Sequence, residues 1–236
     1  MKTATNMKRY FFVVMAALAV LTLSCTRNAE TALRTGDLVF VSIPSDYDLN
    51  DDSMSGAIGA STSQGASLMK IHVAILEVQG DSLWIIDATI KHGVDRYPLD
   101  TFLTDFTLKD GSLPVFEVLR PNVEAAQAAA FVENAKSFIG QPYDLHFRPD
   151  NGAMYCSELV YNAYVTATGE HLFAEVPMNW KDANGEIPLY WQELFALLGE
   201  EVPQGVPGTN PQEMALEPCL KKLACPLCQA CPQHQE

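Results

Sequence analysis

Cys156 is the residue of this sequence with the clearest capacity for nucleophilic chemistry. It lies where a loop runs into a predicted amphipathic helix, which begins at residue 155 or 156 and extends to about 167. A thiol in a first helical turn lies beside unpaired amides at the positive end of the helix dipole, and both favour the thiolate. The same amides could hold an oxyanion. Taken alone, however, the residue is better explained as a buried structural cysteine.

His72 and Asp87 lie on two strands that are predicted to form a hairpin. The strands cover residues 71–78 and 83–88, and Gly80–Asp81 between them is a turn signal. A turn through these two residues brings Asp87 onto the same face as His72, one diagonal step away. Diagonal neighbours are about 7–8 Å apart at the backbone, which is within side-chain reach. The carboxylate could therefore orient and charge the imidazole, but a turn one residue longer or shorter would break the parity.

A thiolate at a helix start and a His–carboxylate pair on a sheet are together the catalytic groups of a papain-like cysteine hydrolase. In the papain order the cysteine precedes the histidine, whereas here the histidine comes first, as a circular permutation would produce. Several segments resemble, in order and spacing, the permuted NlpC-like papain-fold amidases, the YiiX/YaeF-like group, over about residues 36–216. The segments that carry the resemblance are Gly36–Phe40, His72–Ile75, Gln141–Asp144, Tyr155–Val160, Pro188–Trp191 and Gly205–Thr209.

The resemblance implies an α+β fold of the circularly permuted papain-like (NlpC-like) type, with an antiparallel sheet packed against helices. It also implies a cysteine nucleophile, a histidine base and a third polar residue on the strand after the histidine. These roles map onto Cys156, His72 and Asp87. The third residue is a glutamate in many relatives, so Asp87 is a shorter variant. Related members are amidases or acyltransferases, some of which cut cell-wall peptides while others handle lipid acyl groups.

Three functions are consistent with these residues. The first is a lipid-anchored hydrolase of an amide or peptide bond, with cell-wall peptide as one substrate class. The second gives the same triad an acyl ester or lipid, as a hydrolase or acyltransferase. The third keeps the fold as a catalytically silent lipid- or peptide-binding module. The presence of all three triad residues favours an enzyme, for which no cofactor is expected.

Four other polar residues lie near the candidate triad in the sequence. Tyr155 and His146 precede Cys156 and are candidates for lining the cleft. His92 is interpreted as a solvated turn residue. Glu158 is expected to point away from the thiol, because positions two apart on a helix do not face each other.

The remaining pattern predicts one α+β domain. Besides the hairpin and the helix at Cys156, the expected elements are strands at 36–41, 94–97 and 115–119, and helices at 123–139 and 189–198. The expected irregular segments are a long loop at 44–70, with a helical turn at 56–60, and an extended surface segment at 199–218.

The N-terminus resembles a bacterial lipoprotein signal. Three cations precede an apolar run at residues 10–21, which is too short for a membrane span and suits the core of a signal peptide. Cys25 follows a small residue just after this run, and in lipoproteins such a cysteine is diacylated and becomes the N-terminus. An ordinary secretory signal is the alternative, but no Ala-x-Ala site competes. We therefore expect a lipoprotein of the bacterial cell envelope, anchored only by lipid at Cys25.

The C-terminal tail contains four closely spaced cysteines, Cys219, Cys225, Cys228 and Cys231. Such spacing suggests zinc or an iron–sulfur cluster, whereas an exported, oxidising setting favours disulfides. A poorly ordered appendage explains the tail as well as a metal does, so no metal is assigned. The expected organisation is a signal peptide at 1–24, a tether at 25–35, the catalytic domain at 36–218 and the tail at 219–236.

The composition restricts the class of protein and its partners. The 236 residues are 48% hydrophobic and 19% charged, which is enough apolar material for a core and excludes an intrinsically disordered chain. The 15 Lys and Arg residues against 29 Asp and Glu give a net charge of −14 with no basic block, so nucleic acid is disfavoured as a partner. The expected partner is a peptide or acyl substrate, and the oligomeric state is left open.

Overall fold

The computed structural model describes residues 32–49, 53–224 and 227. The chain divides into two compact units, one formed by Arg34–Lys222 and the other by Met1–Leu33 together with Leu223–Glu236. The larger unit contains the candidate triad, and its fold is described below.

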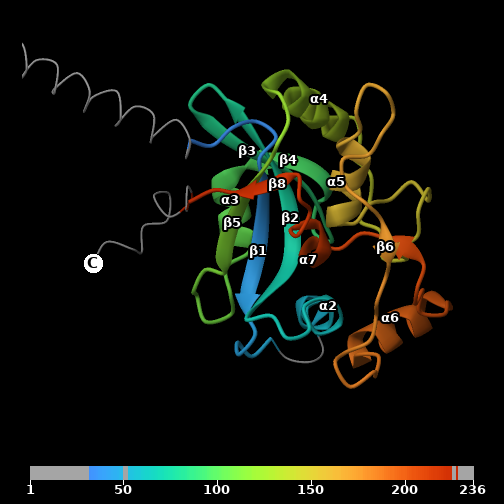
Figure 1. The fold of residues 1–236 in the computed structure, drawn as a ribbon. Helices are drawn as coiled ribbons and strands as arrows, with labels where there is room; N and C mark the ends of the chain where they lie inside the picture. The colour runs from blue at the N-terminus through green and yellow to red at the C-terminus, as the bar shows by residue number, and fades with distance from the viewer. Residues whose placement is uncertain (1–31, 50–52, 225–226, 228–236) are drawn as a thin grey trace, which may run out of the picture. The chain divides into compact units, whose positions relative to one another are not determined.

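A six-stranded antiparallel sheet forms the centre of the larger unit (Figure 1). Its strand order is β4-β3-β2-β1-β5-β8. The strands are β1 (Leu38–Pro44), β2 (Leu68–Gln79), β3 (Ser82–Thr89), β4 (Gly93–Pro98), β5 (Val115–Pro121) and β8 (Leu220–Lys222). The central strands β1 and β2 are apolar and buried over most of their length, as expected for strands covered on both faces. A separate two-stranded sheet pairs β6 (Val176–Pro177) with β7 (Pro207–Gly208).

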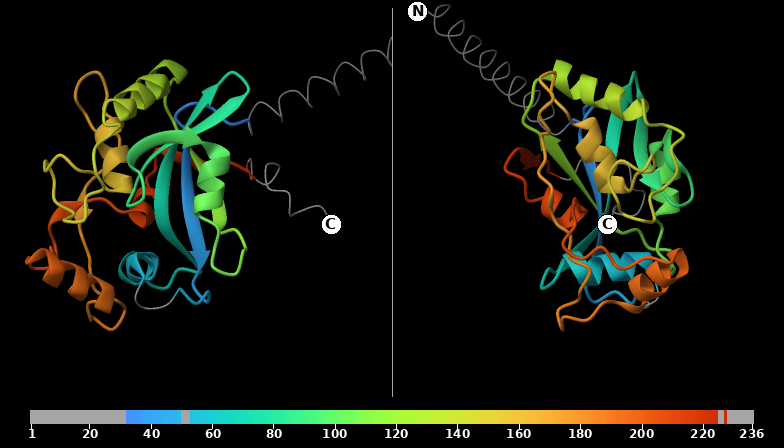
Figure 2. Two further views of the ribbon diagram at one scale, coloured as in Figure 1. Left: turned by 180° about the vertical axis from the view of Figure 1, so that it is seen from behind. Right: turned by 90° about the vertical axis from the view of Figure 1, so that its right-hand side faces the viewer.

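Helices cover both faces of the central sheet. The helices are α2 (Met54–Thr62), α3 (Leu99–Asp105), α4 (Ala125–Lys136), α5 (Cys156–Ala163), α6 (Leu189–Leu198) and α7 (Pro211–Met214). Phe40 of β1 packs in one core cluster with Phe131 of α4 and Leu159 of α5, and these two helices lie side by side (Figures 1 and 2). On the opposite face, Phe116 of β5 contacts Phe102 of α3, with their ring centroids 5.8 Å apart. Successive side chains of a strand point to opposite faces of the sheet, so the same strands contribute apolar residues to the packing on each face.

A second apolar cluster is built from α2, α6, the loop that precedes α5 and the segment between α5 and α6. Trp180 and Trp191 meet edge to face, with their ring centroids 4.7 Å apart. Phe147 packs against both of them although its backbone is left-handed, with φ of 51°. A phenylalanine in this conformation is strained, so the surrounding packing must hold it there.

The structure confirms the α+β class and the antiparallel sheet packed against helices. It differs from the sequence expectation at α3, where no helix is predicted. Seven residues are too few for a helix that is stable by itself, and α3 is held by the burial of Leu99, Phe102 and Leu103. The expected loop at 44–70 contains α2 and the start of β2, and Leu220–Lys222 adds the strand β8 to the sheet.

Candidate active site

Cys156 is the first residue of α5, and it is a free, buried thiol. Tyr155 before it is extended, with φ of −92° and ψ of 170°, so the chain turns into the helix at this position. Residues Leu159 and Val160 of α5 are fully buried in the main core cluster. The packing of these side chains against the sheet fixes the start of α5, and with it the position of the thiol.

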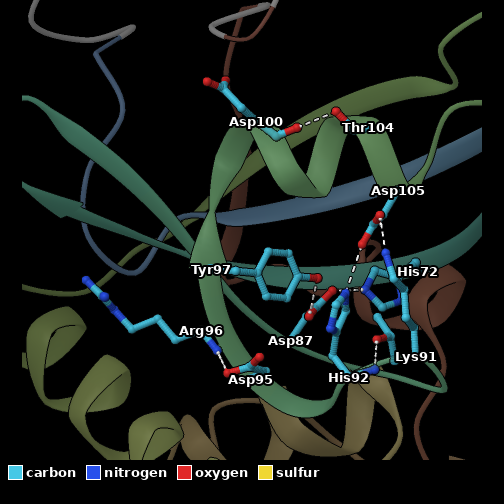
Figure 3. A network of polar contacts seen from close by, with 11 residues as sticks. His72, Asp87, Lys91, His92, Asp95, Arg96, Tyr97, Asp100, Thr104 and Asp105 are labelled. Atoms are coloured by element: carbon cyan, nitrogen blue, oxygen red, sulfur yellow. Dashed lines mark hydrogen bonds and ion pairs between the residues drawn. The ribbon is translucent and has the colours of Figure 1, made fainter.

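His72 and Asp87 form the hydrogen-bonded pair that the hairpin parity predicts (Figure 3). The pairing of β2 with β3 runs from Ile75–Ile86 to Gln79–Ser82, which is the register of a turn through residues 80 and 81. His72 Nε2 lies 2.8 Å from Asp87 Oδ2, and both residues are buried. The predicted hydrogen bond is therefore confirmed.

The aromatic side chains around α3 enclose the imidazole. The ring centroid of His72 lies 4.7 Å from that of Phe106 and 6.1 Å from that of Phe102. These contacts leave the ring little freedom to rotate. A helix that the sequence pattern does not predict therefore helps to position the candidate base.

Cys156 is the second partner of His72. Burial lowers the pKa of His72, but the charge of Cys156 and the hydrogen bonds with Asp87 and Cys156 outweigh it and raise the pKa to about 10. Because Nε2 is bonded to Asp87, Nδ1 is the nitrogen left for the thiol. At neutral pH the raised pKa keeps His72 protonated, and an imidazolium beside a thiol favours the charged form of that thiol.

Tyr97 is a fourth member of this group that the sequence reasoning missed. Its hydroxyl donates to Asp87 Oδ1 at 2.7 Å, so both oxygens of the fully buried carboxylate have a partner (Figure 3). Ile85 pairs with Tyr97 and Asp87 with Asp95, so Tyr97 and Asp87 are diagonal neighbours on one face. The diagonal rule that pairs His72 with Asp87 would also have identified Tyr97, given the register of β4.

We expect Tyr97→Phe to lower the free energy of unfolding by about 1–3 kcal/mol, because Asp87 Oδ1 would be buried without a donor. Urea unfolding at neutral pH measures the loss. Tyr161→Phe is the matched control, since the Tyr161 hydroxyl meets Glu175 at 3.4 Å in an exposed position. The control should change stability by no more than about 0.5 kcal/mol. Equal losses in the two variants would contradict a special role for the Tyr97 hydroxyl.

His92 belongs to a second polar network rather than to an isolated solvated turn. Its Nε2 lies 2.9 Å from Asp105 Oδ2, and Lys91 Nζ lies 2.6 Å from Asp105 Oδ1 (Figure 3). The ring centroid of His92 also lies 5.0 Å from that of Tyr97. These contacts join the turn between β3 and β4 to the end of α3, which carries the aromatic residues around His72.

A pocket that is partly open to solvent lies at Cys156. Tyr155 lines it, as expected, together with Trp180 and Trp191. His146 is not among its lining residues, because its partly exposed side chain turns to Glu200, with Nδ1 2.9 Å from Glu200 Oε1. The neighbouring Phe147 occupies the wall instead, so the expectation for His146 is corrected.

Glu158 is a buried carboxyl group in the first turn of α5. Its Oε2 accepts from the backbone N–H of Tyr155 at 3.4 Å. Burial raises the pKa of Glu158 to about 8, and the charge of the buried Asp144 adds to the shift. Asp144 itself accepts from the backbone N–H groups of His146 and Arg148 and so shapes the loop before Cys156.

We expect Glu158→Gln to flatten the dependence of stability on pH between about 4.5 and 8. The unfolded chain releases this proton near 4.5 and the folded chain near 8, so rising pH favours unfolding over this interval. The natural protein should lose on the order of a few kcal/mol between pH 5 and 8 from this group. Urea unfolding at both pH values measures the loss, and the exposed Glu193→Gln is the control. An unchanged slope in Glu158→Gln would refute the assignment.

Of the four tail cysteines, only Cys219 lies within the described residues. Its thiol is half-buried, and its Sγ lies 3.9 Å from the Leu172 carbonyl oxygen. Cys225, Cys228 and Cys231 lie outside the described residues. Across the described ranges, no three His, Cys, Asp or Glu side chains are grouped in a way that could hold a metal ion.

Comparison with known proteins identifies relatives of this arrangement. Residues 32–224 match the model of a family described as permuted papain-like amidase enzymes, YaeF/YiiX, C92 family. The uncharacterized protein YiiX of Escherichia coli K12 is 24% identical over 192 residues, which is 81% of this chain and 86% of that protein. A crystal structure described as metalloprotein yiiX from Escherichia coli O157:H7 matches with a TM-score of 0.61 and 23% identity. That match covers 81% of this chain and 96% of the other. The expected permuted papain-like fold is therefore confirmed.

Proposed function

The chain belongs to the permuted papain-like amidases of the YaeF/YiiX family, and we propose that it cleaves an amide bond with Cys156, His72 and Asp87 as a catalytic triad. The observation that carries the proposal is the chain of side-chain contacts from Cys156 through His72 to Asp87. A buried histidine that faces a thiol with one nitrogen and a carboxylate with the other fits the roles of nucleophile, base and orienting group.

The first half of the reaction acylates the thiol. The Cys156 sulfur attacks the carbonyl carbon of the substrate, and the new C–S bond pushes electrons onto the carbonyl oxygen. The first amides of α5 have no acceptor within the helix, and they stabilise this oxyanion. As the C–N bond breaks, His72 Nδ1 gives its proton to the leaving nitrogen. The products are a thioester on Cys156 and a free amine.

The second half releases the acyl group. His72, now neutral, takes a proton from water while the water oxygen attacks the thioester carbonyl. The C–S bond then breaks, and the products are a carboxylic acid and the restored thiolate–imidazolium pair. Asp87 keeps Nδ1 aimed at the thiol through both halves by holding Nε2, and Tyr97 in turn holds Asp87.

The test compares an anilide and a phenyl ester that share one acyl group. Purified protein is mixed with each substrate, product formation is followed, and the intact mass of the quenched protein is recorded. The proposal expects turnover of the anilide and an acyl adduct that maps to Cys156. Turnover of the ester alone would favour an acyl-ester hydrolase or acyltransferase. Absence of both turnover and adduct would favour the silent binding module.

We also propose that the chain is exported and held to a membrane by lipid on Cys25. The support is the signal-like sequence of residues 1–25, which lies outside the described residues. Within the part of the chain that the structure describes, no helix combines the length and apolarity of a membrane span.

Cys25→Ala is expected to abolish incorporation of labelled fatty acid and to shift the protein out of the membrane fraction or leave the precursor uncut. Metabolic labelling with palmitate in a bacterial host measures the first effect. Cys219→Ala is the control and should label like the natural protein. Undiminished labelling of Cys25→Ala would rule out this anchor.

A further inference from the structure

The pocket at Cys156 has walls without charge. Its apolar surface comes chiefly from the side chains of Ile58, Phe147, Tyr155, Met178, Trp180 and Trp191. Apart from the reactive Cys156, the polar residues that join them are neutral, and no Asp, Glu, Lys, Arg or His is found among the described residues that line it.

The position of the pocket relative to His72 indicates which half of a substrate it receives. Cys156 lines the pocket, whereas His72 does not and instead packs against Phe102 and Phe106 of the α3 region. In the proposed reaction His72 gives its proton to the leaving amine, so the amine must lie on the histidine side of the thiol. The half that stays on Cys156 as a thioester is then the half that can extend into the pocket.

The residues that line the pocket also restrict the charge of the acyl half of the substrate. A carboxylate in this pocket would lose its hydration and find no positive charge on the walls, which is strongly unfavourable. Aromatic and aliphatic groups gain free energy there by leaving water.

Ser157 provides one polar contact in these apolar surroundings. Its hydroxyl is fully buried, lines the pocket beside Cys156 and has no hydrogen-bond partner among the described residues. A buried hydroxyl without a partner is costly, so a substrate group that hydrogen-bonds to it removes an existing penalty.

We propose that this pocket is the acyl-side subsite and that the substrates are amides of neutral, apolar acyl groups. The inference rests on the proposed function, and it narrows that function to a substrate class. It disfavours amides whose acyl half carries a carboxylate close to the scissile bond.

The experiment uses two anilides with the same leaving aniline, one acylated with 4-methylpentanoate and the other with succinate. The acyl chains are of similar length, and only succinate has a charged end. We expect kcat/KM to be at least about 100-fold higher for the neutral substrate. A mass adduct of the 4-methylpentanoyl group on Cys156 shows that the acyl half is the half retained.

Two variants place a cation at the pocket. Ile58 and Thr62 of α2 are both half-buried lining residues, so Ile58→Lys and Thr62→Lys each add a charge that can pair with succinate. Either folded variant should lower kcat/KM for the neutral anilide and raise it for the succinyl anilide. The control is Ile139→Lys, at an exposed position outside the pocket, which should keep the natural ratio.

The possible failures separate the two proposals. Equal or better turnover of the succinyl anilide by the natural protein would overturn the neutral subsite and leave the amidase function standing. If folded Ile58→Lys and Thr62→Lys keep the natural ratio of kcat/KM between the neutral and the succinyl anilide, the acyl half of the substrate must bind outside this pocket. Absence of turnover and of any adduct with both anilides would overturn the amidase function and this inference together.

Discussion

Replacing Cys156 with serine is expected to lower amide turnover by about 10⁴-fold or more while leaving the fold intact. The two side chains are nearly isosteric, but a hydroxyl does not ionise beside His72 as a thiol does. Steady-state kinetics and thermal unfolding of the two proteins measure the two effects. Cys219→Ser is the matched control, because it changes a half-buried thiol outside the pocket. The control should keep the natural turnover.

Alkylation separates a reactive Cys156 from an inert one. Iodoacetamide near neutral pH should modify Cys156 faster than Cys219, because burial raises the pKa of the Cys219 thiol. His72→Ala should slow the modification of Cys156, since it removes the imidazolium that stabilises the thiolate. Peptide mass spectrometry across a pH series reads both sites in one sample.

Each alternative for Cys156 predicts a different labelling pattern. A buried structural cysteine would label slowly and would not respond to His72→Ala. A disulfide would block labelling until a reductant is added. A thiol that stays inert with and without reductant would remove the enzyme proposal and leave the binding module.

The second large effect is expected at Asp87. Asp87→Asn keeps the size of the side chain but removes the charge that His72 Nε2 contacts at 2.8 Å. We expect kcat/KM to fall by about 100-fold or more, because the imidazolium loses its orienting partner. Kinetics with the neutral anilide measure the loss, and Asp100→Asn, on the exposed side of α3, is the control.

The pH profile gives Asp87→Asn a readout that a merely structural change would not produce. Asp87 helps to raise the pKa of His72 to about 10, so its removal lowers that pKa. The proton that His72 must donate is then lost at lower pH, and the alkaline limb of kcat/KM moves to lower pH. A variant whose alkaline limb stays in place would contradict the proposed role of Asp87.

The raised pKa of His72 also predicts how the stability of the protein depends on pH. His72 binds its proton more tightly in the folded chain than in the unfolded chain, so its contribution is full below about pH 6.5 and is lost as pH rises toward 10. The pH-dependent part of the stability difference between the natural protein and Asp87→Asn should therefore shrink across this interval. Urea unfolding at several pH values follows it.

Local sequence patterns determined the elements that carry the candidate triad. The period of two and the turn at residues 80 and 81 fix the hairpin register, so the contact of His72 with Asp87 follows from parity. The change to helical period places Cys156 at a helix start, and the expected helix at 189–198 has the bounds of α6. These features depend on residues close in the chain, which is why the sequence is sufficient for them.

Tertiary structure alone decided how these elements meet. The approach of Cys156 to His72 depends on α5 packing against the sheet, and the enclosure of His72 depends on α3, which is too short to be predicted from its own residues. Phe147, rather than His146, reaches the pocket because packing holds its backbone in a left-handed conformation. The uncharged walls beside the thiol come from segments far apart in the chain. Their assembly depends on the summed burial of many side chains, a quantity that no local pattern encodes.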